Sequence, residues 1–479
     1  MAESKPFLRR QVAATVLGQF SRAVVQLLSL LVLARLIFPA DFGLIAVAMV
    51  PIGVLEILRE LSLSTLLSSE RQFGHQERSN FFWLSCSAGL AAYVALLLVS
   101  QPISDLTRLP NLVNVLQVAG VTLVVNGIAS PHRTLLIGQL RMVELATVDF
   151  LSLTTGFASS IILASGGWGY HALVFQQVFQ SFVALGVVWV LTRWRPGMYD
   201  NTVKVKATLV HGIRLSLSQV LDFLSKNADT MSLSLTSTAA SLGFYTRAYQ
   251  LTYAPLQQAA TPMSRFVYPL MARYSSDTKN TAEKYKVMAH VFLLSFVPIF
   301  AVLAGDSDEV VKLLLGQGWS PSAAPLFFLA LAGQLQCVVM AMEWWVVFHK
   351  FTGRYLIAIS WSRLLFVAII FLGSLASVLG VAVAFLVCCG LSVLVTTISL
   401  RDQKLFLAVW KFVLVRTLVA FTFAVLEIML LRFMLTESFG RLLLCIFCVI
   451  MSTIAIGASH RDSRVAVVSL LNPSRAERG

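Results

Sequence analysis

Residues 19–29 read QFSRAVVQLLS and residues 219–229 read QVLDFLSKNAD, and both apolar stretches carry polar side chains at matching places. The polar residues recur at steps of three or four: Gln19, Arg22, Gln26 and Ser29 in the first stretch, and Gln219, Asp222, Lys226 and Asp229 in the second. Such steps put each set on one face of a helix. A charge that faces lipid is costly. We therefore expect both faces to look into protein or water, with a polar cavity between two halves of the molecule.

The composition is that of an integral membrane protein. The 479 residues are 57% hydrophobic and only 13% charged, whereas a soluble domain averages roughly 25% charged residues. Apolar stretches of about 20 residues, each long enough to cross a hydrocarbon core of roughly 30 Å, recur along the whole chain. No soluble domain of useful size is expected, and the N-terminus shows no signal-peptide cleavage pattern. The predicted fold class is therefore an all-α integral membrane protein.

About fourteen transmembrane helices are predicted from these stretches. Their approximate ranges are 11–37, 43–67, 80–102, 112–130, 143–165, 170–192, 207–235, 242–271, 285–304, 323–348, 355–373, 378–400, 411–433 and 442–458. An internal repeat divides them, because Ala40-Asp41-Phe42-Gly43 joins the first two spans and Ala240-Ser241-Leu242-Gly243 joins the seventh and eighth. Each half then has six spans and enters the membrane from the same side. This predicts two six-helix lobes as parallel repeats plus a C-terminal helix pair.

The repeat also sets the predicted domain boundaries. They are an N-terminal lobe at 1–203, a C-terminal lobe at 204–403, the extra helix pair at 404–458 and a tail at 459–479.

The positive charge is distributed unevenly along the chain. Net charge is +14. Most lysines and arginines outside the spans fall in one set of alternate loops and termini, and the opposite set holds only Arg108, Lys312 and Arg441. This asymmetry predicts that the basic loops and both termini are cytoplasmic. Contact with anionic membrane lipids explains the excess charge better than a nucleic-acid partner does.

Charged residues inside the predicted spans are candidates for a functional site. Two interpretations stay open. In the first, the charges pair within the helix bundle, as Asp222 with Lys226 at i,i+4, and Glu56 and Glu60 around Arg59. In the second, the first, second, seventh and eighth spans line a central cavity whose cations attract an anionic head group such as a diphosphate. The cations that would supply this potential are Arg22, Arg59, Lys226 and Arg247.

The predicted substrate cavity joins these cations to the polar faces of the two opening stretches. From the residues alone its members are Gln19, Arg22, Gln26, Arg59, Gln219, Asp222, Lys226, Asp229 and Arg247. Glu56, Glu60 and Asp149 are candidates for proton or ion coupling, because a buried acid can titrate during transport. His132, expected in a short cytoplasmic loop after Pro131, and His171 are predicted to be interfacial and not to couple protons.

The sequence carries no pattern of catalysis or cofactor binding. There is no P-loop, no Ser/His/Asp arrangement and no metal-ligand cluster. The six cysteines all fall in apolar spans and are interpreted as small core residues. The chain is therefore predicted not to be an enzyme and to need no cofactor or metal.

Several stretches resemble a known family. They are LARLIFPADFG at 33–43, Asn227-Ala228-Asp229 with LGFYTRAYQL at 242–251, GWGYHALV at 167–174 with Gln176-Gln177, and LLGQGW at 314–319 with Ala324-Pro325-Leu326. Together they cover most of the first 400 residues, in order. They resemble Wzx-type polysaccharide flippases, in the polysaccharide transporter branch of the multidrug/oligosaccharidyl-lipid/polysaccharide exporter superfamily.

The resemblance implies a two-lobed transporter that alternates its opening across the bacterial inner membrane. The implied cargo is an undecaprenyl-diphosphate-linked oligosaccharide repeat unit, moved from the cytoplasmic to the periplasmic leaflet for exopolysaccharide or lipopolysaccharide biosynthesis. Implied partners are this lipid-linked substrate, membrane lipids, and a polysaccharide polymerase with its export machinery. The resemblance also adds Asn227 to the cavity. Many relatives carry Arg where this chain has Lys226, which keeps the charge but loses the bidentate fork.

Two alternative functions are weighed against this one. A cation-coupled drug exporter of the same fold would favour an acidic pocket, whereas the deep charges here are of mixed sign. A membrane polysaccharide polymerase or ligase usually has a large outer loop for its chemistry. The longest outer loop expected here, near 305–322, is short, which disfavours an enzyme of that kind.

Overall fold

The computed structural model describes residues 5–60, 74–200, 206–273, 278–349, 352–401, 403–434 and 438–458. Within these ranges the chain is helical with short connections and contains no strand. Ten of the described helices are long and apolar enough to cross a membrane, and Trp361–Ala376 and Leu444–Thr453 are shorter apolar helices. The predicted all-α, membrane-spanning fold is therefore confirmed, and the count of fourteen spans stays a prediction.

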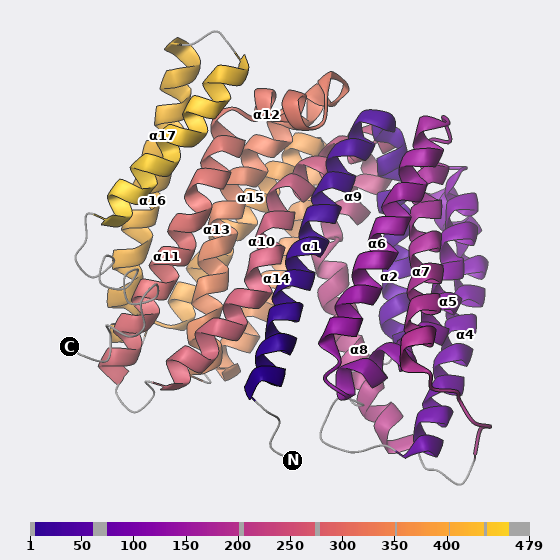
Figure 1. Ribbon diagram of the computed structural model, residues 1–479. Helices are drawn as coiled ribbons and strands as arrows, with labels where there is room; N and C mark the ends of the chain where they lie inside the picture. The colour runs from indigo at the N-terminus through magenta and orange to yellow at the C-terminus, as the bar shows by residue number, and fades with distance from the viewer. Residues whose placement is uncertain are drawn as a thin grey trace. The chain divides into compact units, whose positions relative to one another are not determined.

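The chain divides into two compact units, Met1–Thr246 and Arg247–Gly479. The first unit contains α1 (Lys5–Leu36), α2 (Pro39–Glu60), α4 (His75–Thr107), α5 (Leu112–Gly138), α6 (Met142–Ser165), α7 (Tyr170–Thr192), α8 (Lys206–Lys226) and α9 (Ala228–Thr236). These are the indigo to magenta helices of Figure 1. The helix α10 (Ala239–Arg273) begins in this unit and continues into the second.

The second unit is also built of helices with short connections. They are α11 (Thr278–Gly305), α12 (Ser307–Leu314), the 3-10 helix η1 (Gln317–Ser322), α13 (Ala323–Phe348), α14 (Thr352–Ala376), α15 (Val378–Ser399), α16 (Lys404–Met434) and α17 (Ser438–Ala458). The C-terminal pair packs on α11, where Gly305 lies against the side chain of Ile428. Arg432 strengthens this packing, because its Nη2 lies 2.8 Å from Asp308 Oδ2. Asp308 belongs to the expected outer loop, which the structure folds into α12 and η1.

The starts of α2 and α10 cross at two equivalent glycines. A methyl group on Gly43 would overlap the carbonyl oxygen of Ala239, and one on Gly243 would overlap the carbonyl oxygen of Pro39. Only glycine allows so close an approach of two backbones. The contact is reciprocal at the same offset as the two polar stretches, which supports the predicted repeat. The compact units divide the chain after Thr246, because α8 packs on α2, where the Phe223 ring lies against Gly53.

The segment after α7 folds back along the start of α4. The side-chain amide of Asn80 donates to the carbonyl oxygen of Asp200 at 2.7 Å, and its oxygen accepts from the Asp200 backbone N–H at 2.9 Å. Ser79 Oγ accepts from the Gly197 N–H at 2.9 Å. Since Ser79 and Asn80 are buried, these bonds fix the connection to the first unit as far as residue 200.

Candidate functional site

The polar face of α1 lies on an uninterrupted helix. Gln19 is partly buried, Gln26 is exposed, and Ser29 Oγ accepts a hydrogen bond of 3.1 Å from the side-chain amide of Gln176 on α7. The side chain of Arg22 is 43% exposed and its Nη1 lies 3.8 Å from Asp149 Oδ2 on α6. The predicted polar face is therefore present on α1, and its one cation, Arg22, is partly exposed.

Asp149 has a second and closer cation. Nη2 of Arg133, on α5, donates to Asp149 Oδ1 at 2.5 Å, and the Asp149 side chain is 20% exposed. Two arginines therefore share one carboxylate between α1, α5 and α6. The cluster carries a net positive charge. Arg133 is a candidate functional residue that the sequence did not indicate, because Pro131 predicts a loop there.

The second polar stretch is a broken helix. α8 ends at Lys226, α9 begins at Ala228, and Asn227 lies between them with φ −109° and ψ 14°. The Asn227 side-chain amide donates to the carbonyl oxygen of Phe223 at 2.8 Å, and the same oxygen accepts the Asn227 backbone N–H at 3.0 Å. A side-chain bond of this kind to the preceding turn can distort a helix. The single span expected over 207–235 is therefore two helices. Broken spans of this kind are a common way to place polar groups within a membrane.

Lys226 ends α8 and pairs with Asp222. The Nζ–Oδ2 distance is 2.7 Å, with side-chain exposures of 58% for Lys226 and 32% for Asp222. The i,i+4 pairing expected from the sequence is confirmed. Gln219, one turn earlier on the same helix, is exposed.

Asp229 lies in the interior and does not share this exposure. It is 4% exposed. Its Oδ2 accepts a 2.8 Å hydrogen bond from the hydroxyl of Tyr245, and its Oδ1 accepts a 2.7 Å bond from the backbone N–H of Thr230. Tyr245 is itself fully buried at the start of α10. This geometry ties α9 to α10, and the place of Asp229 in the substrate cavity stays a prediction.

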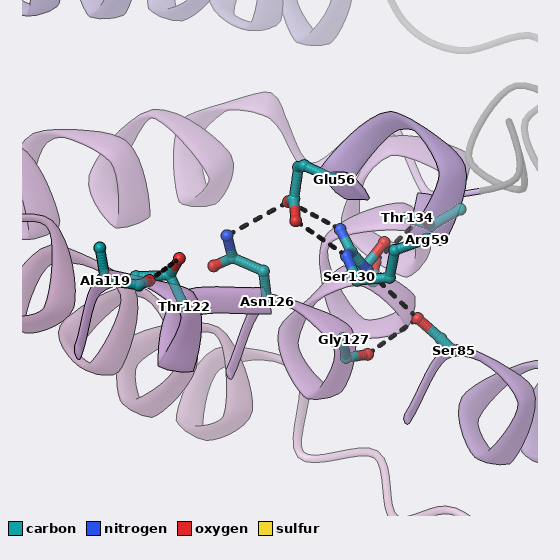
Figure 2. A network of polar contacts seen from close by, with 9 residues as sticks. All are labelled: Glu56, Arg59, Ser85, Ala119, Thr122, Asn126, Gly127, Ser130 and Thr134. Carbon is teal, nitrogen blue, oxygen red and sulfur yellow. Dashed lines mark hydrogen bonds and ion pairs between the residues drawn. The ribbon is translucent and has the colours of Figure 1, made fainter. Parts of the chain in front are cut away.

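Glu56 and Arg59 form a network with α4 and α5 (Figure 2). Arg59, only 4% exposed, donates from Nη2 and Nε to the two Glu56 oxygens at 2.8 Å and 3.0 Å. The Asn126 amide donates to Glu56 Oε1 at 3.2 Å. Ser85 Oγ lies 3.5 Å from Arg59 Nη1 and donates to the Gly127 carbonyl at 2.9 Å. The expected pairing around Arg59 is confirmed for Glu56, and Asn126 and Ser85 are members that the sequence did not indicate.

The same network explains an incorrect prediction about His132. The residue was expected in a loop, but α5 continues through Pro131 to Gly138 and His132 is fully buried. Pro131 has no N–H for the carbonyl four residues earlier, that of Gly127. Ser85 supplies the missing donor to that carbonyl. The centroids of the His132 and Trp189 rings are 4.4 Å apart, and His132 Nδ1 lies 2.9 Å from Thr192 Oγ1, so His132 is a core residue of the first unit.

The remaining predicted residues lie on α2, α7 and α10. Glu60 is partly buried on the last turn of α2. His171 is exposed at the start of α7, as expected. Arg247 belongs to the second unit, is partly buried, and donates to Gln250 Oε1 at 2.6 Å.

Comparisons with known proteins identify relatives of the whole arrangement. A family model described as "Polysaccharide biosynthesis protein" matches residues 32–324. Lipopolysaccharide biosynthesis protein WzxC of Escherichia coli (strain K12) is 24% identical over 319 residues, which are 65% of this chain and 64% of that protein. Succinoglycan biosynthesis transport protein ExoT of Rhizobium meliloti (strain 1021) is 19% identical over 323 residues, 67% of this chain and 65% of that protein. The match thus spans slightly under two thirds of the length of these two relatives.

Solved structures share the fold. The lipid II flippase MurJ, in an inward closed conformation, matches with a TM-score of 0.73 and 13% identity, over 92% of this chain and 97% of that one. An inward-facing multidrug resistance MATE family transporter of the MOP superfamily matches with a TM-score of 0.53 and 16% identity, over 83% and 96% of the two chains. At such identities the likeness shows the fold alone, which is the helical fold of these transporters.

Proposed function

Because the chain belongs to the polysaccharide biosynthesis protein family and spans the membrane several times, we propose that it is a flippase for a lipid-linked oligosaccharide. Its cargo is an undecaprenyl-diphosphate-linked repeat unit, moved by alternating access from the cytoplasmic to the periplasmic leaflet of a bacterial inner membrane. Both termini face the cytoplasm, and a polymerase and export machinery use the product. The protein performs no chemistry on the cargo.

The observation that carries this proposal is the exposure of two cations on matched polar faces. Arg22 and Lys226 are 43% and 58% exposed, and each retains that exposure although an acidic side chain lies beside it. Cations within apolar spans are costly where they face lipid, so they face protein or water. A water-filled route lined by such cations attracts the negative diphosphate while the sugar passes.

The test measures both surface polysaccharide and the lipid-linked precursor in cells that carry variants of the chain. In a strain that lacks its own copy, the wild-type chain restores surface polysaccharide. We expect Arg22→Gln and Lys226→Gln each to reduce surface polysaccharide at least about tenfold, because each removes one charged contact to phosphate. The lipid-linked precursor then accumulates in the inner leaflet. Arg141→Gln is the matched control, since Arg141 pairs with Glu144 and with the carbonyl of Leu191.

Two results would contradict the proposal. Full export by both variants at normal protein levels would show that transport does not depend on these two cations. Normal polysaccharide in the deletion strain, with accumulation of a cationic drug, would favour the drug exporter. The mixed signs of the charges argue against that alternative, since Glu56 and Asp149 are both held by arginines.

The same proposal includes the acidic residue that couples export to an ion gradient. Glu56, Glu60 and Asp149 are the candidate acids, and Glu56 is placed best among them. Its side chain is 31% exposed while Arg59 behind it is 3% exposed. Its carboxylate is held by Arg59 and Asn126 and remains partly exposed, so that it can meet a coupling ion from the open side. Glu56→Gln should therefore uncouple export from the ion gradient without preventing substrate binding.

A further inference from the structure

Arg133 and Arg22 meet at one carboxylate with unequal contacts. Arg133 lies 2.5 Å from Asp149 Oδ1, and Arg22 lies 3.8 Å from Asp149 Oδ2. The first contact is a direct charge-assisted hydrogen bond, whereas the second distance exceeds hydrogen-bonding range. Asp149 is thus neutralised mainly from α5. Arg22, on the polar face of α1, feels its attraction without being bound by it.

We propose that Arg133 is a positioning residue that keeps Arg22 available for the phosphate groups of a lipid-linked diphosphate. This inference rests on the proposed function. By pairing with Asp149, Arg133 prevents that carboxylate from closing on Arg22 in a bidentate pair. A guanidinium that is already in a bidentate pair has to give up both bonds before it can bind phosphate.

The geometry also accounts for the presence of Asp149. A cluster of two arginines and one carboxylate has a net charge of about one positive unit, enough to attract a diphosphate. Without the carboxylate, two neighbouring guanidinium groups would repel each other within the bundle. Asp149 therefore holds Arg133 in place, and Arg133 in turn limits how tightly Asp149 holds Arg22.

The second polar face is built differently. Lys226 pairs with Asp222 one turn before it on the same helix, at 2.7 Å. A lysine ammonium rotates freely and is more easily released from such an exposed pair. We infer that Arg22 is the primary phosphate contact of the two and that Lys226 is the accessory one.

Direct binding by the purified full chain tests the inference. The probe is undecaprenyl diphosphate, with undecaprenol as the uncharged control, and affinity is measured in detergent micelles. Arg133→Gln should weaken diphosphate binding about tenfold, because Arg22 then becomes the sole cationic partner of Asp149 in this cluster. The double variant R133Q/D149N should bind within about twofold of wild type, since no carboxylate is left to capture Arg22. Arg133→Lys should also bind nearly normally.

Two further variants separate positioning from direct contact. Arg22→Gln should lose binding and should not be rescued by Asp149→Asn. Asp149→Asn alone should bind at least as well as wild type, because the repulsion between the two guanidinium groups lowers stability, whereas the positive charge that attracts the diphosphate increases. Arg141→Gln is the control for loss of an arginine, because its side chain is 32% exposed, as is that of Arg133. Thermal unfolding of every variant identifies any that fails to fold. If R133Q alone does not fold, R133Q/D149N can still be compared with wild type, because it removes one positive and one negative charge and leaves the net charge of the cluster unchanged.

The outcomes distinguish this inference from the proposed function. If wild type binds undecaprenyl diphosphate but R133Q binds equally well, or if the double variant stays as weak as R133Q, the positioning role is overturned and the flippase proposal stands. Weak binding by Asp149→Asn would likewise overturn it, because Asp149 would then orient Arg22 directly. If wild type binds undecaprenyl diphosphate no better than undecaprenol, both the proposed function and this inference are overturned.

Discussion

Helix α5 continues through Pro131, whereas the span made of α8 and α9 breaks at Asn227 although it contains no proline there. The two regions differ in the side chain that donates to a backbone carbonyl. In α5 a side chain from another helix, Ser85, donates to the carbonyl that Pro131 leaves open. At the break, the carbonyl of Phe223 accepts both the backbone N–H of Asn227, at 3.0 Å, and its side-chain amide, at 2.8 Å. A proline is tolerated where a neighbour supplies a donor, and a side chain that bonds its own helix can distort that helix without a proline.

The two regions also differ in what they place beside the break or the proline. Around Pro131 the network buries its arginine, Arg59, and leaves an acid, Glu56, partly open. At the break the acid, Asp229, is buried on Tyr245, and the cation, Lys226, is open. The first region thus presents a carboxylate and the second an ammonium group. Their proposed roles in coupling and in substrate binding follow from this contrast.

The largest expected loss of stability is at Asp229, the buried residue that follows the break between α8 and α9. Asp229→Ala should lower the free energy of unfolding by about 3 kcal/mol, because the Tyr245 hydroxyl and the Thr230 N–H both lose their acceptor inside the protein. Tyr245→Phe should cost less, about 1.5 kcal/mol, since Asp229 keeps the Thr230 bond. Thermal unfolding in detergent micelles measures both. Ser29→Ala, at the equivalent place on α1, is the control and should cost under about 1 kcal/mol.

The next largest loss of stability tests how helix α5 accommodates Pro131. Ser85→Ala should cost about 2 kcal/mol, because the Gly127 carbonyl is left without its donor. Adding Pro131→Ala should restore most of this loss, since an alanine at that position supplies a backbone N–H to that same carbonyl. Ser87→Ala is the control on α4, because the Ser87 hydroxyl bonds the Leu84 carbonyl of its own helix. If the double variant is as unstable as Ser85→Ala alone, Ser85 does not act through Gly127.

The sequence predicted the all-helical, membrane-spanning fold because its signal is local. Apolar stretches, the repeated glycine corners and the i,i+4 pair of Asp222 and Lys226 depend on residues that are close in the chain or on composition. The glycine corners were predicted as equivalent turns, and the structure shows them in reciprocal contact at Gly43 and Gly243. The family, too, was identified from motifs in order along the chain.

The site was harder to predict because its partners are distant in sequence. Ser85 and Gly127 are 42 residues apart, and Arg22 meets Asp149 on a helix four spans later. Pro131 suggested a loop, and this hid both Arg133 and the burial of His132. Asn227 gave no signal of a break, because asparagine is acceptable inside a helix unless its side chain bonds the backbone. For Pro131 the tertiary bond from Ser85 decides the outcome, whereas at Asn227 the decisive bond is local and the residue type alone does not predict it.

A smaller effect on stability is expected when the break is removed. Asn227→Leu gives α8–α9 the residue that α1 has at the equivalent place, Leu27. Leu has the better helix propensity, so the free energy of unfolding should change by only about 0.5 kcal/mol. Export should nevertheless fall, because a continuous helix rotates Lys226 away from its present position at a helix end. Normal surface polysaccharide with this variant would show that the break has no part in transport.

The smallest effect belongs to the exposed pair at the end of α8. Asp222→Asn removes the carboxylate that lies 2.7 Å from Lys226, but Lys226 is 58% exposed and water screens the attraction. The loss of stability should therefore be about 0.3 kcal/mol at low ionic strength and should disappear at about 1 M salt. Thermal unfolding at two salt concentrations measures this. A loss above about 1 kcal/mol that persists in salt would mean that the pair holds the break together, and the contrast with the buried Arg59 network would then fail.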